Sequence, residues 1–112
     1  MAPKPVGALL IVSRVDAADA ESLRAFGDEL RAKAKSAAIA LGAVFDGKPA
    51  IAIMLTPDRV EAGLHAGKIA KQVGAEMGAG GGGRPDTATA GGRDAGALDA
   101  GLAKASVLLA GG

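Results

Sequence analysis

The most informative stretch of this chain is Gly78-Ala79-Gly80-Gly81-Gly82-Gly83-Arg84-Pro85-Asp86, with Gly91-Gly92-Arg93 following a few residues later. Each glycine held in one conformation costs about 0.5–1 kcal/mol relative to alanine. The net stability of a domain is only about 5–15 kcal/mol, so some interaction must offset that cost. Three interpretations are open: a flexible linker, a backbone that passes very close to another element, and a cradle of N–H groups for an anion such as phosphate.

The residues that follow the glycines argue against a linker. Arg84 supplies a guanidinium suited to bidentate binding of an anion, Pro85 fixes one φ angle, and Asp86 supplies a capping carboxylate. Flexible spacers usually lack such features. Anion contact and close backbone packing therefore remain as the two leading interpretations, and both can hold together.

Before this stretch, the sequence predicts a strand and then a helix. The apolar run Ala8-Leu9-Leu10-Ile11-Val12 is typical of a strand buried on both faces. Asp16 and Asp19 are candidate N-caps of the helix that follows. Its predicted buried stripe is Leu23, Phe26, Leu30 and Ala34, and its predicted solvent side is Arg24, Asp28, Arg31 and Lys35.

Next, the periodicity changes from helical spacing to alternation. Two alternating runs flank Asp46-Gly47-Lys48-Pro49, which predicts a β-hairpin. One face is expected to hold mostly large side chains: Ile39, Leu41, Ala43, Phe45, Ile51, Ile53 and Leu55. The other is expected to hold only Ala38, Ala40, Gly42, Ala50 and Ala52, so that another element or a partner could approach it closely.

The rest of the chain predicts two more helical regions around the glycines. Thr56-Pro57 is a cap followed by a first-turn proline, and the helix it opens is expected to break near Gly63 to Gly67 and resume with Ile69, Val73 and Met77. After the glycines, Asp94 is expected to cap a last helix that buries Leu98, Leu102, Ala105 and Leu109.

These elements predict an α/β fold: a small mixed β-sheet with helices packed against it as a single pair of layers. With 112 residues, the chain is expected to form one domain over 1–112. Within it, 1–6 is expected to be a flexible lead, 78–93 a glycine-rich loop, and 94–109 a C-terminal helix.

Composition limits the function. The formal charge is +1, there is no cysteine, and His65 is the single histidine. A near-neutral chain is not drawn as a whole to nucleic acid or to membranes, so any basic site must be local. No thiolate metal site or disulfide is available, and no apolar run approaches the ~20 residues that cross a bilayer. We expect a cytoplasmic protein with no cofactor, no metal and no membrane partner.

The motifs Asp46-Gly47-Lys48-Pro49, Thr56-Pro57-Asp58 and Gly80-Gly81-Gly82-Gly83-Arg84-Pro85-Asp86, with Ala90-Gly91-Gly92, resemble the C-terminal globular domain of alanyl-tRNA synthetase. That domain belongs to the DHH-associated group, and the likeness extends from about Val6 to the end of the chain. One short segment departs from the family pattern. The family has an apolar residue, Ala, Gln and Ala where this chain has Thr87-Ala88-Thr89-Ala90, so a contact through the amide would be lost at Thr89.

The resemblance implies a non-catalytic, DHH-associated-like domain that grips tRNA, with tRNA-Ala as its partner, and that supports aminoacylation and editing by the parent alanine-tRNA ligase. Self-association or contact with the rest of the synthetase is a further expectation. No catalytic or metal motif stands out, so we do not expect the chain itself to be an enzyme. Two alternatives stay open: an oligomerisation or docking domain that uses the small-residue face, and a nucleic-acid-holding accessory domain of a DHH-type phosphoesterase.

The predicted nucleic-acid-binding residues centre on the glycine stretch. Each has a structural alternative: close packing for the glycines, turn or capping roles for Asp86 and for the Gly91-Gly92 pair, and plain solvation for the lysines. His65 and Lys48 carry only a weak signal. The predicted site residues are Gly80, Gly81, Gly82, Gly83, Arg84, Asp86, Gly91, Gly92, Arg93, Lys68 and Lys71.

Overall fold

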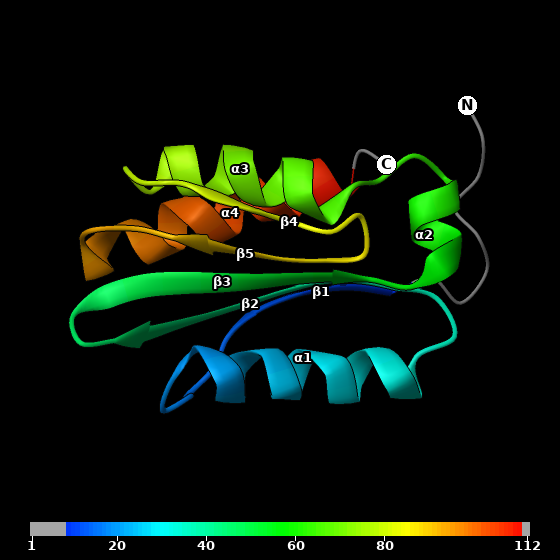
Figure 1. The fold of residues 1–112 in the computed structure, drawn as a ribbon, viewed down its shortest axis with the longest axis horizontal. Helices are drawn as coiled ribbons and strands as arrows, with labels where there is room; N and C mark the ends of the chain where they lie inside the picture. The colour runs from blue at the N-terminus through cyan, green and yellow to red at the C-terminus, as the bar shows by residue number, and fades with distance from the viewer. Residues whose placement is uncertain (1–8, 111–112) are drawn as a thin grey trace.

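The computed structural model describes residues 9–110 (Figure 1). The expected lead at 1–6 therefore lies outside the described residues, as does Ala8 of the first predicted strand. The elements in chain order are β1 (Leu9–Arg14), α1 (Ala20–Lys33), β2 (Ala37–Phe45), β3 (Lys48–Leu55), α2 (Pro57–Glu61), α3 (Ala66–Glu76), β4 (Gly81–Gly83), β5 (Thr87–Gly91), a 3-10 turn at Ala95–Ala97, and α4 (Leu98–Ala110).

The five strands form one mixed sheet in the order β1-β2-β3-β5-β4. The first two strands are parallel and are joined through α1, whereas every other neighbouring pair is antiparallel. The predicted mixed α/β fold is confirmed. The last two strands, which lie within 78–93, extend the sheet beyond β3 and leave β4 at its edge.

Helices cover both faces of this sheet rather than one (Figure 1). On one face α1 packs on β2 and β3, and on the other α3 and α4 pack over the strands and against each other. The prediction of a single pair of layers is therefore wrong. The reason lies in β2 and β3, where apolar side chains occupy successive positions, so that both faces must be covered to remove them from water.

The predicted small-residue face of the hairpin does not exist. The register places Ala40 opposite Ile53 and Leu41 opposite Ala52, so both faces of the hairpin carry large side chains opposite small ones. Ala38 and Ala40 lie in the core under α4, where they are 3% and 0% exposed. The tight Asp46-Gly47 turn sets which residues of β2 and β3 lie opposite each other. The alternation within each strand does not reveal this register.

Most helix predictions are confirmed. Asp19 caps α1 by accepting a hydrogen bond from the Ser22 N–H at 2.8 Å, and the broken helix appears as α2 and α3. All four residues predicted for the core side of α4 are buried. The exception is Phe26, which is 45% exposed, because α1 turns Gly27 toward Met54 instead.

The segment 78–93, expected as a loop, contains β4 and β5. In β5, buried and outward-facing residues alternate: Ala88 and Ala90 are buried, while Thr87 and Thr89 lie on the opposite side. Such alternation is a strand signal, but the small size of alanine hides it beside four consecutive glycines. No helix within residues 9–110 is long and apolar enough to cross a membrane.

Candidate functional site

The helix α3 and the glycine stretch are in backbone-to-backbone contact. A Cβ atom added at Gly74 of α3 would lie 2.3 Å from the carbonyl carbon of Gly80, and one added at Gly81 would lie 2.4 Å from the carbonyl oxygen of Ala70. Real Cβ atoms do not approach other atoms this closely. The interpretation of the glycines as a close backbone approach is therefore supported at Gly81, which α3 covers directly.

Gly82 has a different environment from Gly81. A Cβ added at Gly82 would meet no atom within 4 Å. Gly82 pairs with Thr89 across the antiparallel ladder, and opposed residues of such a pair point to the same face. The fold thus leaves the space beside Gly82 open, on the face of the sheet away from α3.

The glycines do not form a cradle of converging N–H groups. Gly81–Gly83 is a strand, in which successive N–H groups point to opposite sides. The N–H of Gly91 donates to Gly80 and the N–H of Arg84 donates to Thr87, which fixes the hydrogen-bond alternation along the ladder. An extended ligand could contact this strand, but a single phosphate could not be enclosed by it.

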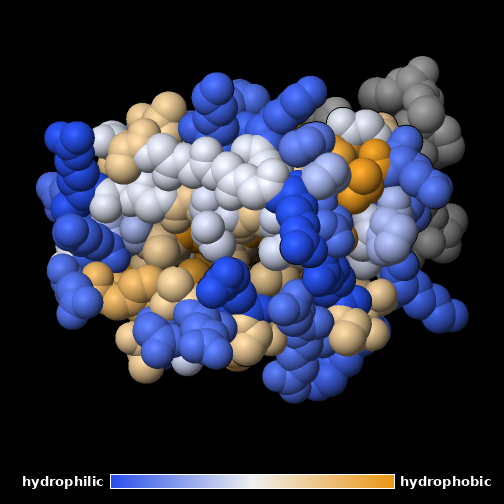
Figure 2. All heavy atoms as spheres, in the orientation of Figure 1, coloured by the Kyte–Doolittle hydropathy of each residue, from blue (hydrophilic) through white to orange (hydrophobic). Residues whose placement is uncertain are grey.

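An open groove of about 620 Å³ lies between α1 and the β4–β5 part of the sheet. It exists because α1 packs over β2 and β3 but not over the last two strands. Its α1 wall holds Glu21, Arg24, Ala25, Asp28 and Arg31, and its sheet side holds Gly82, Gly83, Arg84, Asp86, Thr87, Ala88 and Thr89. Figure 2 shows this face, where a pale band of weakly polar residues runs above the charged residues of α1 with a hollow between them.

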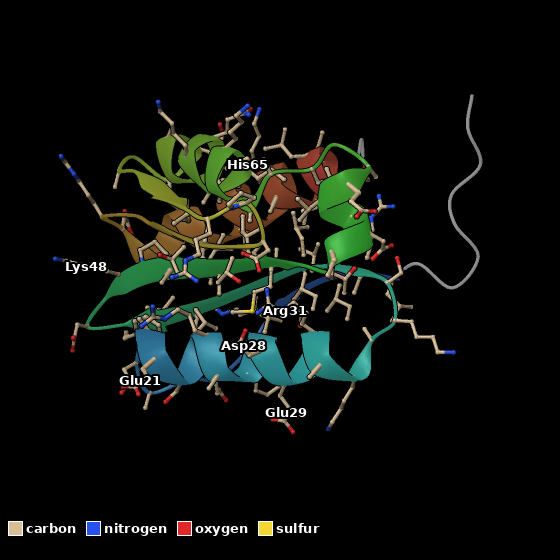
Figure 3. The ribbon with its side chains drawn as sticks, turned by 45° about the vertical axis from the view of Figure 1, so that its right-hand side comes forward. Glu21, Asp28, Glu29, Arg31, Lys48 and His65 are labelled. Carbon is tan, nitrogen blue, oxygen red and sulfur yellow. The ribbon has the colours of Figure 1, made fainter. Side chains whose placement is uncertain are left out.

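Arg31 closes one end of the groove. Its Nη1 donates to the Thr87 hydroxyl at 2.7 Å and to the Asp86 carbonyl at 3.1 Å, and its Nη2 donates to Asp28 at 2.8 Å. The Asp86 carboxylate lies 3.6 Å from the same guanidinium. Figure 3 shows Asp28 and Arg31 on the sheet side of α1, with Glu29 on the opposite side of the helix. The prediction that Arg31 only faces solvent is wrong, since it ties α1 to the turn before β5.

The turn at Arg84-Pro85 is held from its other side by the start of α3. The N–H of Ala66 donates to the Pro85 carbonyl at 2.7 Å, and the N–H of Gly67 donates to the Arg84 carbonyl at 3.0 Å. The Arg84 side chain itself is exposed and lines the groove. Within residues 9–110 it has neither an ion pair nor a side-chain hydrogen bond, so its guanidinium is available to a ligand.

The structure brings only some of the predicted site residues together. Gly82, Gly83, Arg84 and Asp86 line the groove. The other predicted residues lie outside its lining. Gly92 is packed, with its N–H donating to the Pro49 carbonyl at 3.1 Å, and Arg93 is exposed. Lys68 and Lys71 are exposed on α3, which covers the opposite face of the sheet. The remaining members are Gly80, Gly81 and Gly91.

Two polar residues with structural alternatives have clear partners. The Asp86 carboxylate lies beside Arg31 rather than capping the local backbone, while its carbonyl accepts from the N–H of Leu55 at 2.8 Å. His65 is the N-cap of α3, because its Nδ1 accepts a hydrogen bond from the Lys68 N–H at 3.1 Å. The structural interpretation of His65 therefore accounts for that side chain.

Sequence reasoning missed the α1 wall and the threonine side of the groove. Glu21, Arg24, Asp28 and Arg31 recur at intervals of three and four, which marks one stripe of a helix. The sequence predicts that Arg24, Asp28 and Arg31 of this stripe lie on the solvent side of the helix. In the structure this stripe lines the groove, because of where α1 lies relative to β5. No local sequence pattern reveals that position. Within residues 9–110, no group of three or more His, Cys, Asp or Glu side chains could hold a metal ion.

Comparison with known proteins identifies a family and close relatives for this chain. Residues 7–111 match the model of the DHHA1 domain. The chain is 52% identical over 103 residues to an alanine–tRNA ligase of Herpetosiphon aurantiacus and 47% identical over 97 residues to that of Bacillus subtilis. Those alignments cover 92% and 87% of this chain but 12% and 11% of the two ligases, so the chain spans about a tenth of their length.

The fold has also been seen before. The crystal structure of the C-Ala domain from Aquifex aeolicus alanyl-tRNA synthetase superposes with a TM-score of 0.73 at 23% identity, covering 97% of this chain and 98% of that one. The resemblance to the C-terminal domain of alanyl-tRNA synthetase is thus confirmed. With the family model matching nearly its whole length, the chain belongs to the DHHA1 domain family.

Proposed function

We propose that this chain is a non-catalytic tRNA-binding domain of an alanyl-tRNA synthetase and that it contacts RNA through the exposed side of β4 and the Arg84 guanidinium. Its relatives are named alanine–tRNA ligases, which makes tRNA-Ala the expected partner and the cytoplasm the expected location. The domain would support aminoacylation and editing by the parent ligase, while the chemistry takes place elsewhere in that protein.

One observation carries this proposal. Gly82 sits in a strand, where glycine is disfavoured, yet the space that a side chain would occupy there is open. Packing therefore does not explain the absence of a side chain, as it does at Gly81. A ligand that must approach the backbone does explain it, and the unpaired Arg84 guanidinium two residues later supplies the charge that a phosphodiester requires.

The docking alternative loses the surface on which it was based. Ala38 and Ala40 are buried under α4, so no small-residue face is left for a partner. Self-association through another surface, and contact with the rest of the synthetase, stay within the proposal. The accessory-domain alternative shares the same RNA-facing strand and differs in its preferred ligand, which would be a short oligonucleotide rather than folded tRNA.

The test is a fluorescence anisotropy titration with a labelled tRNA-Ala transcript at several salt concentrations. Only a few phosphate contacts are available, so we expect a slope of log affinity against log salt of about −2 to −4, at ~0.9 per contact. Arg84→Gln should weaken binding and reduce that slope by about 0.9. Gly82→Val should weaken binding by blocking approach to β4.

Two matched variants serve as controls. Arg14→Gln removes an exposed arginine at the end of β1, and Ser13→Val places the same side chain on an exposed strand position far from β4. Both should bind tRNA like the wild type. Equal binding by the wild type, Arg84→Gln and Gly82→Val would refute the proposed interface, and no binding by the wild type at low salt would refute tRNA binding itself.

A further inference from the structure

The groove between α1 and β4–β5 is a site in its own right. Its volume of about 620 Å³ falls within the range of about 300–1,000 Å³ that small-molecule sites occupy. Its sheet side is polar, because the Thr87 and Thr89 hydroxyls face it while their neighbours Ala88 and Ala90 face the core. This part of the sheet face is therefore not an apolar surface that another helix would bury.

Positive and negative side chains are equal in number in the groove, and this limits the class of ligand that it could bind. Three arginines, Arg24, Arg31 and Arg84, lie among three carboxylates, those of Glu21, Asp28 and Asp86. A site for several phosphates would carry an excess of positive charge. A nucleoside instead presents both hydrogen-bond donors and acceptors on its base and ribose, together with a flat apolar face, and a groove of mixed polarity can satisfy these groups.

The two ends of the groove differ in what is free to bind. At one end, Arg31 is engaged by Asp28, Asp86 and Thr87. Towards the other end, within the part of the chain that the structure describes, Arg24 and Glu21 have no side-chain hydrogen bond or ion pair, and Thr89 is exposed. Since Gly82 is paired with Thr89, this free end adjoins the open side of β4.

An arginine can take the place of an aromatic stacking platform here. Bases that are splayed out of an RNA stack on aromatic rings or on guanidinium planes. The chain has two phenylalanines, and neither lines the groove. With Arg84 assigned to the phosphodiester, the Arg24 guanidinium is the flat group left for the base. Glu21 can act as an acceptor, and the Thr89 hydroxyl as a donor or acceptor, for the polar edge of that base.

We infer that this groove holds one unpaired nucleotide of the bound RNA, with its base against the Arg24 guanidinium and its polar edge toward Glu21 and Thr89. The inference rests on the proposed function, in that the RNA runs along β4 beside Gly82. It adds the feature of the RNA that is recognised: an unstacked base rather than a duplex end or a phosphate cluster.

The experiment uses two probes besides the tRNA transcript: a single-stranded hexaribonucleotide of mixed sequence and a blunt 12-base-pair RNA duplex. Amide chemical-shift mapping with the hexanucleotide should perturb Arg24, Gly82 and Thr89. The variant Arg24→Gln should weaken hexanucleotide binding at least about fivefold, because it removes the planar guanidinium on which the base stacks. Duplex binding should not change, and Arg14→Gln should match the wild type throughout.

Arg24→Lys separates stacking from charge, since lysine keeps the charge but lacks the planar fork. It should bind the hexanucleotide nearly as weakly as Arg24→Gln, and full affinity would overturn the stacked geometry. Unchanged binding by Arg24→Gln, or shifts that avoid the groove, would overturn the inference even if Arg84→Gln still weakens tRNA binding. If the hexanucleotide occupies the groove but tRNA does not bind, the inference holds and the proposed function fails.

Discussion

The guanidinium of Arg31 on α1 donates a 2.7 Å hydrogen bond to the hydroxyl of Thr87 on β5, across 56 residues of sequence. The same side chain holds the carbonyl of Asp86 and the carboxylate of Asp28. One arginine thus connects the helix on one face of the sheet to the turn that presents Arg84. The position of the proposed RNA-binding groove depends on this contact, because α1 is one wall and β5 is part of the other.

We expect Arg31→Gln to lower the free energy of unfolding by about 1 kcal/mol, since it breaks hydrogen bonds from a charged donor that is one-quarter exposed. Urea unfolding of Arg31→Gln, Thr87→Val and the double variant measures the coupling between the two side chains. The loss caused by Arg31→Gln should be smaller when Thr87 is already valine. Additive losses would show that the 2.7 Å contact contributes nothing to stability. Lys33→Gln, which removes an exposed ion pair with Glu29, should change stability by less than about 0.5 kcal/mol.

Neighbouring glycines of the same strand should respond oppositely to alanine. Gly81→Ala forces a Cβ against the backbone of α3, and we expect it to cost about 1–3 kcal/mol as an overpacked site. Gly82→Ala enters open space and removes the conformational freedom of glycine, so it should be neutral or stabilise by up to about 1 kcal/mol. Urea denaturation of the two variants tests this contrast, and equal effects would contradict the packing of α3 on β4.

Gly74→Ala should act like Gly81→Ala, because it meets the same backbone contact from the helix side. Alanine is a better helix former than glycine by about 1 kcal/mol, so an isolated helix would gain from this change. The clash with Gly80 should outweigh that gain and leave the protein less stable. Gly96→Ala, at a site where a new Cβ would come no closer than 3.4 Å to another residue, is the control and should unfold like the wild type. A stabilised Gly74→Ala would show that β4 can move away from α3.

Asp58 should make stability depend on pH under acidic conditions. The Ser36 hydroxyl, followed by that of Thr56, donates a hydrogen bond to this carboxylate and lowers its pKa below the ordinary 3.8. In this pH range the folded state binds fewer protons than the unfolded state. The contribution of the Asp58 carboxylate to the free energy of unfolding is therefore complete above pH 3.8 and is lost as the pH falls through the lower pKa of the folded state. Urea unfolding between about pH 2 and 6 should show a shallower dependence for Asp58→Asn and for Ser36→Ala. An unchanged dependence in both variants would exclude this source.

Ala40→Glu should unfold the protein rather than report on self-association. Ala40 is 0% exposed beneath α4, so the variant would bury an unpaired carboxylate, which is among the most destabilising changes known. Far-UV circular dichroism and amide shift dispersion should both reveal the loss of structure. A folded Ala40→Glu would mean that α4 can separate from the sheet. Val107→Glu, at a 68% exposed position, should stay folded.

Much of the local structure followed from short patterns. The Asp19 cap, the break between α2 and α3, the buried side of α4 and the hairpin turn all depend on residues within a few positions of one another, and the structure has each of them. The family membership also followed from the glycine stretch and its Arg-Pro-Asp ending. The predictions that failed depend on contacts between distant parts of the chain. They concern the face that Ala50 and Ala52 share, the burial of Phe26 by α1, and the pairing of 78–93 as strands. The expectation that the first strand is buried on both faces also failed, because β1 lies at the edge of the sheet with Leu9 and Leu10 exposed.

The sequence by itself determined the order of the elements up to α3 and again at α4, the absence of cysteine and so of any thiolate metal site, and the placement of glycine where two backbones meet. Only the tertiary structure decided that β4 and β5 join the sheet beside β3, that Gly81 is covered while Gly82 is open, and that α1 and β5 enclose a groove between Arg24 and Thr89. The reason is physical. Hydrophobic periodicity and capping depend on residues within a few positions of one another. Strand order and the position of a helix on the sheet depend instead on side-chain packing between residues far apart in sequence.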